Sequence, residues 1–135
     1  MAPPVRFTDS ITVDANSGTS EASLFVNPAS DYLKDHFPGA PTLPGLVMLE
    51  AAVRAAGALW DATRPSGAAA HLEHVERLQV VRRVVPGETF VVQTAIDASS
   101  LEDAASFTAR GTVAGAPAMR ARFSLRRGVA NERSG

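Results

Sequence analysis

The sequence predicts an α+β fold in which an antiparallel sheet wraps around one long central helix. Residues from Pro44 to about Ala62 favour a helix, because proline stands at its start and leucine, methionine, alanine and glutamate dominate its interior. Almost every position of this helix is apolar, so we expect other elements to surround it. The chain after the helix is β-rich, and a helix followed by antiparallel strands implies a sheet packed around that helix.

Strand-like runs lie on both sides of the helix. Before it, β-favouring residues occupy 6–14 and 20–26, and residues 31–35 predict one short helical turn. After it, turn-forming residues such as Pro86-Gly87 and Gly115-Ala116-Pro117 separate four further runs. These runs are 71–85, 89–98, 104–114 and 118–127. The last two flank a short turn and predict a hairpin.

Length and composition limit the class of protein. The 135 residues suit a single domain, with residues 1–5 and 128–135 as loose ends. The net charge of −1 gives no general attraction to nucleic acid or to anionic membranes. The chain has no cysteine, which excludes disulfides, thiolate nucleophiles and cysteine-based zinc sites. Residues 1–6 lack the apolar run of a signal peptide, and residues 46–60 are too short to span a bilayer. We therefore expect a soluble, cytoplasmic protein.

One segment carries most of the chemical information. His36 and Glu50 stand fourteen positions apart, and Pro44-Gly45 marks a helix start between them. An imidazole suits proton abstraction near neutral pH. A glycine at a helix N-terminus exposes unpaired backbone N–H groups and lets a carbonyl approach them. A glutamate in apolar surroundings favours its protonated form and can donate a proton. These residue types indicate an acyl site that moves protons, although they do not fix which group is the acid.

The same segment resembles the signature of the 3-hydroxyacyl-[acyl-carrier-protein] dehydratases of the FabZ/FabA type. That signature runs His-Phe-Pro-Gly-x-Pro, two residues, Pro-Gly, four residues and an acid. Here it stands as His36-Phe37-Pro38-Gly39-Ala40-Pro41, then Pro44-Gly45, then Glu50. A second block, Val81 to Glu88, resembles the family's strand that leads into a Pro-Gly-acid turn. The resemblance extends from about Ser20 to Arg127 and implies the hotdog fold.

The resemblance also implies an activity. It is a hydro-lyase reaction that removes water from 3-hydroxyacyl thioesters on acyl carrier protein and gives trans-2-enoyl thioesters, without metal or cofactor. It implies His36 as the base, Glu50 as the acid and Gly45 as the group that polarises the carbonyl. The residues expected to contact substrate are Phe37, Pro44, Leu46 and Arg54. In the family the histidine and the acid come from opposite subunits, so we expect a homodimer, a trimer of dimers or a hotdog heterodimer.

The chain departs from the family pattern at two places, and the first departure points to a specialised relative. Residues 1–19 show nothing like the Pro-His-Arg-x-Pro-Phe-Leu-Leu segment of housekeeping members. The family usually carries glutamine four residues after the acid, whereas this chain has Arg54. An i,i+4 ion pair between Arg54 and Glu50 would hold the carboxylate charged and weaken it as a proton donor. Fatty-acid and polyketide-type pathways both remain open, as does the length of the acyl chain.

Other interpretations stay open. A hotdog thioesterase would hydrolyse the thioester, and a non-catalytic subunit of a heterodimeric dehydratase would shape an acyl tunnel for its partner. The arginines at 82, 83, 120, 122 and 126 are candidates for contact with an acidic carrier protein or for a solvated face. His71 and His74 stand near Glu73 and Glu76, but their spacing fits no closed metal site, so we expect structural or surface histidines.

Overall fold

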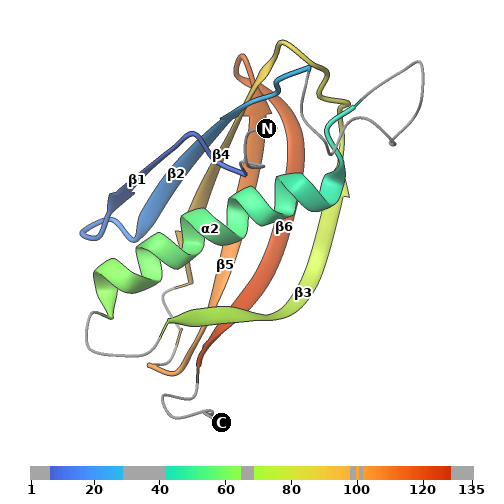
Figure 1. Ribbon diagram of the computed structural model, residues 1–135. Coiled ribbons are helices and arrows are strands. Elements are labelled where there is room, and N and C mark those ends of the chain that lie inside the picture. Colours follow the sequence, from blue (N-terminus) through green and yellow to red (C-terminus); the bar gives the residue numbers. More distant parts are fainter. Residues whose placement is uncertain (1–6, 29–41, 65–68, 98–99, 101, 129–135) are drawn as a thin grey trace, which may run out of the picture.

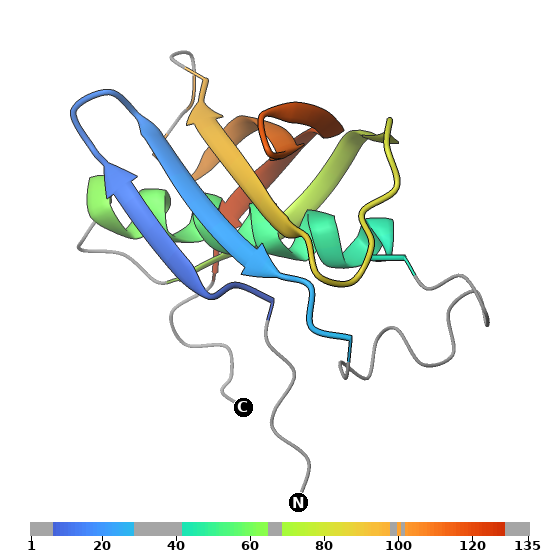
Figure 2. The same cartoon turned by 90° about the horizontal axis from the view of Figure 1, so that it is seen from above.

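The computed structural model describes residues 7–28, 42–64, 69–97, 100 and 102–128. Within them the order is β1 Ser10–Asp14, β2 Thr19–Phe25, α2 Gly45–Thr63, β3 Ala70–Val80, β4 Thr89–Ile96, β5 Ala104–Val113 and β6 Ala116–Arg127. The strands form one antiparallel sheet in the order β1-β2-β4-β5-β6-β3. Helix α2 crosses one face of this sheet (Figure 1), and the view from above shows the helix along one side of the strands (Figure 2). The predicted α+β hotdog architecture is confirmed.

Small side chains bring α2 close to the sheet. Its sheet side carries four fully buried alanines and three larger buried residues. These are Ala51, Ala52, Ala55, Ala56, Met48, Leu59 and Trp60. Buried phenylalanines from β4, β5 and β6 face the core from the sheet, and the rings of Phe107 and Phe123 stack with centroids 5.9 Å apart. Each square ångström of apolar surface buried here contributes about 25 cal/mol, which makes this layer the main source of stability.

The other side of α2 is open, so the expectation that the whole helix is surrounded is wrong for the single chain. Leu46 is 74% exposed, and Glu50, Arg54 and Asp61 follow it at helical spacing on the same side. We call these four residues the open stripe. Apolar composition alone could not show which side of the helix the sheet covers. No helix in the described part of the chain is long and apolar enough to span a membrane.

Strand β3 ends earlier than predicted. The sequence pattern continues to residue 85, but β3 stops at Val80 and residues 81–88 form a loop. The N–H groups of Val81 and Arg82 both donate to the carbonyl of Ala118, and Val84 is fully buried. The apolar run therefore continues into the core as a loop, a case that strand periodicity cannot distinguish from a strand. Strands β4, β5 and β6 form a meander, whereas β3 pairs with β6 at the far edge.

The predicted hairpin at the end of the chain is confirmed. Ala114 and Gly115, with φ of 50° and 84°, form the two-residue connection between β5 and β6. Positive φ at both central positions is the geometry that best matches the twist of paired strands. The runs predicted at 6–14 and 20–26 correspond to β1 and β2. The helical turn predicted at 31–35, together with residues 1–5 and 129–135, lies outside the described residues.

Candidate functional site

The helix that carries the predicted acid begins without a side-chain cap. Pro44 is its N-cap residue, and the Pro44 carbonyl accepts the N–H groups of Val47 at 3.0 Å and Met48 at 3.1 Å. The first turn of the helix contains no acidic residue. The N–H groups of Gly45 and Leu46 have no partner within the helix, as is general for a first turn. This end of α2 therefore offers backbone donors and a positive dipole end to an incoming oxygen.

Gly45 also has a packing role at the same point. A Cβ at Gly45 would lie 3.2 Å from Cγ2 of Val80, at the end of β3. Such a contact is tighter than ordinary van der Waals packing and would push the two elements slightly apart. Glycine thus lets the helix start lie close to β3. This geometry is consistent with a structural role for Gly45 in close packing and with a chemical role in which its backbone binds a carbonyl oxygen.

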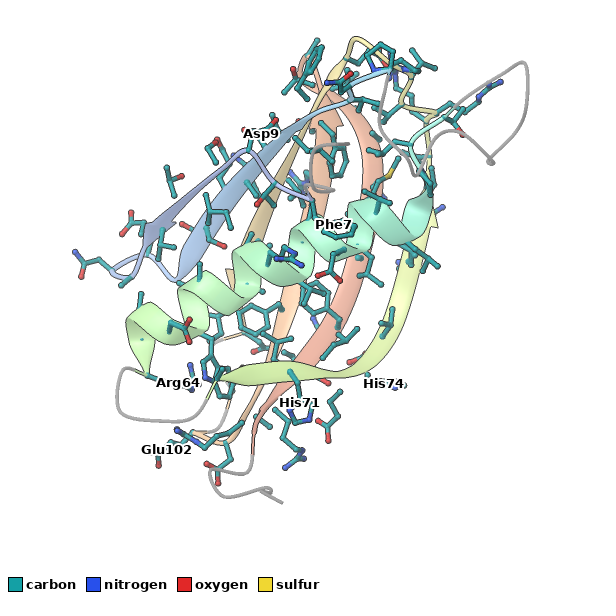
Figure 3. All side chains as sticks on the ribbon, viewed as in Figure 1. Phe7, Asp9, Arg64, His71, His74 and Glu102 are labelled. Atoms are coloured by element: carbon teal, nitrogen blue, oxygen red, sulfur yellow. The ribbon has the colours of Figure 1, made fainter. Side chains whose placement is uncertain are left out.

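Glu50 and Arg54 form the ion pair that their spacing predicts. Nε of Arg54 donates to Oε2 of Glu50 at 2.9 Å, and the side chains of Arg54 and Glu50 are 50% and 40% exposed, respectively. The Arg54 guanidinium also lies 5.0 Å from the centre of the Phe7 ring, and Figure 3 shows Phe7 over the middle of α2. An exposed pair of this kind stabilises a helix by a few tenths of a kcal/mol, about 0.3–0.5. The expectation that Glu50 sits in apolar surroundings is therefore wrong for the single chain.

The segment that contains His36 and Phe37 lies outside the described residues, but the chain on both of its flanks is described. Before the segment, Val26 donates to the carbonyl of Glu88 at 2.9 Å and accepts from the N–H of Gly87 at 2.8 Å. After it, Leu43 donates to the carbonyl of Val84 at 2.7 Å. The single loop 81–88 therefore anchors both flanks of the signature segment.

An internal ion pair shapes this loop. The guanidinium of Arg82 donates to both carboxylate oxygens of Glu88, at 3.1 and 2.8 Å, and the Val85 N–H donates to one of them at 2.9 Å. The hydrogen bonds from Arg82, with a further contribution from Val85, lower the pKa of Glu88 to about 2. The same pairing raises the pKa of Arg82. Sequence reasoning recognised this block as a family motif but missed its role; the available signal was an arginine six positions before the acid of a Pro-Gly turn.

The predicted substrate residues separate into two groups. Pro44, Leu46 and Arg54 lie at the start and along the open side of α2, together with Glu50, whereas Phe37 lies outside the described residues. Of the other apolar side chains on α2 and β4, Val53 is partly buried, and four larger ones are fully buried in the core of the chain. Those four are Met48, Leu59, Trp60 and Phe90.

The two histidines of β3 do not form a site in the described structure. His71 and His74 are both exposed, and Figure 3 shows them along β3, away from the start of α2. No group of three or more potential metal ligands gathers within the described ranges. The expectation of surface histidines agrees with these positions.

Three of the five arginines considered for contact with a carrier protein are already in ion pairs. Arg82 pairs with Glu88, Arg122 with Glu76 and Asp97, and Arg126 with Glu73. Arg83 and Arg120 make no ion pair with a described residue, and both are exposed. Arg83 extends from the loop that anchors the signature segment, whereas Arg120 belongs to β6 in the sheet.

Comparison with known proteins places this geometry in a family. The family model for ApeI-like proteins, described as ApeI dehydratase, matches residues 12–117. The 3-hydroxyacyl-[acyl-carrier-protein] dehydratase FabZ of Thermus thermophilus is 41% identical over 64 residues, which cover 46% of this chain and 45% of that protein. The enzyme of the same name from Oenococcus oeni is 31% identical over 68 residues, covering 50% and 49%. The chain thus spans about half the length, or less, of the curated relatives it matches.

Solved structures share the fold at low sequence identity. The dehydratase heterocomplex ApeI:P from Xenorhabdus doucetiae has a TM-score of 0.66 at 20% identity, over 94% of this chain and 100% of that chain. A hypothetical thioesterase with coenzyme A from Streptococcus pneumoniae has the same TM-score at 8% identity, over 83% and 80%. These likenesses show the hotdog fold and do not separate dehydratases from thioesterases. Because the ApeI-like family model matches most of the sequence, the chain belongs to the ApeI-like family of FabZ-type hotdog dehydratases.

Proposed function

We propose that this protein is a cofactor-independent hydro-lyase that converts 3-hydroxyacyl thioesters into trans-2-enoyl thioesters. The observation that carries the proposal is the position of Glu50. Its carboxylate lies on the open stripe of α2, about one and a half helical turns from the uncapped N-terminus at Gly45. A carboxyl group and a set of free backbone donors are thereby presented on one helix. Membership of a dehydratase family supports the same conclusion.

The proposed reaction assigns one step to each group. The thioester oxygen accepts hydrogen bonds from the first N–H groups of α2, where Gly45 leaves the backbone uncovered. This polarisation makes the α-carbon acidic, and His36 removes its proton. The C–O bond at the β-carbon then breaks as the hydroxyl takes a proton from Glu50 and leaves as water, and a carbon–carbon double bond forms. Arg54 competes with the substrate hydroxyl for Glu50, so their exposed ion pair must open during the cycle.

A second chain completes the site in this proposal. Within the described residues the sheet does not cover the open stripe, where only the ring of Phe7 is seen to contact Arg54, and β3 is a sheet edge of 11 residues. One side of that edge presents backbone groups without strand partners, and Leu72 and Val80 are exposed apolar residues on it. We infer a dimer in which the β3 edges meet and the partner's signature segment reaches Glu50. The solved relative from Xenorhabdus doucetiae is a heterocomplex, so a different hotdog chain is the alternative partner.

The acyl group is proposed to arrive on an acyl carrier protein. The names of the curated relatives specify that carrier. Arg83 is the candidate for contact with the acidic carrier, because it is exposed on the loop that anchors the signature segment. Arg82 is a weaker candidate, since both arms of its guanidinium hold Glu88. The pathway is proposed to be fatty-acid or polyketide-type biosynthesis.

The experiment for this proposal is the substitution His36→Ala, assayed with a 3-hydroxyacyl thioester on acyl carrier protein. We expect 2-enoyl product to disappear while circular dichroism and the melting temperature stay unchanged. His71→Ala is the matched control, because it removes an exposed histidine far from the start of α2, and it should retain turnover. Normal turnover by His36→Ala would refute the assignment of the base.

A hotdog thioesterase is the second candidate, and the Glu50–Arg54 ion pair is the observation that favours it. A carboxylate that accepts a hydrogen bond from an arginine at the open side of the helix could act as a general base that activates water. The neighbouring structures also include thioesterases. Mass spectrometry of the products separates the two activities, since a thioesterase releases a free 3-hydroxy acid and a dehydratase leaves a 2-enoyl group on its carrier.

A further inference from the structure

Four arginines gather on the face of the sheet that is turned away from α2. Arg110 of β5 lies directly opposite Arg120 of β6, and Arg122 of β6 lies directly opposite Arg77 of β3. Arg120 and Arg122 are two residues apart on one strand and therefore share a face. The register thus gathers two cross-strand pairs, offset by one row, into a cluster that we call the arginine block. The sequence could not show it, because its members come from three strands.

The arginine block opposes folding. Like charges directly opposite each other on neighbouring strands destabilise a sheet. Arg122 is compensated by Glu76 at 3.4 Å and by Asp97 at 3.1 Å. The side chains of Arg77, Arg110 and Arg120 make no ion pair or hydrogen bond with any residue that the structure describes. Three guanidinium groups that have no carboxylate partner among the described residues therefore share one face of the sheet, and packing does not require this arrangement.

The block lies at one end of a hollow in the outer face of the sheet. This hollow has a volume of about 1060 Å³ and is lined by all four arginines. Its floor continues over Thr108 and Gln93, and its far end carries Asp14 and Glu21. The side-chain amide of Gln93 donates to the carboxylate of Glu21 at 3.0 Å, so Glu21 already has a hydrogen-bond partner within the hollow. Since α2 covers only the opposite face of the sheet (Figure 1), the hollow is separate from the site around Glu50.

We propose that this hollow binds a small phosphorylated molecule with two or more phosphate charges, such as a nucleoside diphosphate. The planar fork of arginine matches phosphate oxygens in pairs, and such charge-assisted hydrogen bonds are about twice as strong as neutral ones. Neighbouring strands lie about 4.8 Å apart, a spacing that lets two arginines reach one phosphate group and the next row reach a second. The hydroxyl and amide groups of the floor suit the polar remainder of the molecule.

The carboxylates of the hollow argue for a small ligand rather than a large polyanion. A nucleic acid strand or an acidic protein surface laid across the sheet would meet Asp14 and Glu21 beyond the arginines. Like-charge contacts of that kind cost binding energy. The carboxylate of Glu76 also lines the arginine end, but it is paired with Arg122 at 3.4 Å, so a small phosphorylated molecule at that end avoids Asp14 and Glu21. The charges of the hollow thus favour a compact anion.

Calorimetric titration of the full chain with inorganic pyrophosphate and with ADP tests the proposal. We expect saturable binding that weakens as salt is added, because charges on an open surface are screened. Arg110→Gln should weaken the binding of both probes by about tenfold or more, since it removes a charged donor to phosphate. Arg83→Gln, which removes the same charge from a loop outside the hollow, should bind as the wild type does. Without any anion, Arg110→Gln should melt no lower than the wild type, because it relieves repulsion from Arg120.

Several results would overturn this inference. Equal affinity in Arg110→Gln, or the absence of saturable binding by either probe, would remove the anion site. Binding of poly-L-glutamate without binding of pyrophosphate would identify the face as a protein-docking surface instead. A clear drop in the melting temperature of ligand-free Arg110→Gln would show that the arginine serves the fold. Dehydratase turnover should persist in Arg110→Gln, so this test stands or falls apart from the proposed reaction.

Discussion

Helix α2 packs one side against the sheet and leaves the other side open, and the two sides carry different residues. The sheet side is built from alanines and a few large apolar side chains, all fully buried. The open stripe carries Leu46, Glu50, Arg54 and Asp61, none of which the sheet touches closely enough to bury. Packing accounts for the first set. Packing within the chain gives no reason for the residues of the open stripe. We therefore assign them to the proposed reaction and to contact with a partner chain.

The largest expected effect compares one substitution on both sides of the helix. Leu59→Ala should lower the free energy of unfolding by about 2–5 kcal/mol, because it leaves a cavity against the sheet. Leu46→Ala removes the same atoms from an exposed position and should cost less than about 0.5 kcal/mol. Urea unfolding of both variants measures the difference. A similar loss in both would show that the open stripe is buried against something in the folded protein.

A second matched pair uses two glycines. A Cβ at Gly111 of β5 would lie 2.4 Å from the ring of Phe90, so Gly111→Ala should destabilise the chain by about 1–3 kcal/mol through overpacking. A Cβ at Gly57 of α2 meets nothing within 4 Å, and Gly57→Ala should stabilise the helix by about 0.5–1 kcal/mol. Thermal unfolding of each variant shows whether the substitution lowers or raises the melting temperature. Destabilisation by Gly57→Ala would mean that another chain packs closely there.

Acid unfolding probes the loop that anchors the signature segment. Because the folded pKa of Glu88 is lowered to about 2, its pair with Arg82 contributes stability above its ordinary value near 4.5. This contribution is lost as the pH falls from about 4.5 toward 2. Glu88→Gln should remove that part of the pH dependence and lower kcat by loosening the flanks of the segment with His36. Identical acid curves for wild type and Glu88→Gln would contradict this role.

The smallest effect concerns the ion pair on the open stripe. Arg54→Gln restores the residue type that is usual in the FabZ/FabA family and should change the free energy of unfolding by less than about 0.5 kcal/mol. If the pair must open during turnover, kcat should rise about twofold, as expected for the loss of so weak an interaction. Steady-state kinetics across pH measures this. A strong fall in kcat would instead make Arg54 a contributor to the reaction.

Some features of this structure could be predicted from patterns of residues that lie close together in the sequence. Proline followed by a leucine- and alanine-rich run located α2, the turn residues located the last hairpin, and i,i+4 spacing anticipated the contact of Glu50 with Arg54. Each of these depends on residues close together in sequence.

Other features depend on residues far apart in the chain. The side of α2 that stays open depends on where the sheet lies, and an alanine-rich helix looks similar from every side. The bonds from loop 81–88 to Val26 and Leu43 join backbone groups and leave no pattern in side chains. The arginine block arises only from the register of three strands.

The most direct test of the open stripe as a dehydrating site is product analysis with Glu50→Gln. A 3-hydroxyacyl thioester on acyl carrier protein is incubated with wild type, Glu50→Gln and Asp61→Asn, and the carrier is analysed by mass spectrometry. The account predicts 2-enoyl carrier from wild type and from Asp61→Asn, which loses an exposed carboxylate on the same stripe, and almost none from a folded Glu50→Gln. Full 2-enoyl formation by Glu50→Gln, or release of free 3-hydroxy acid by the wild type, would contradict it.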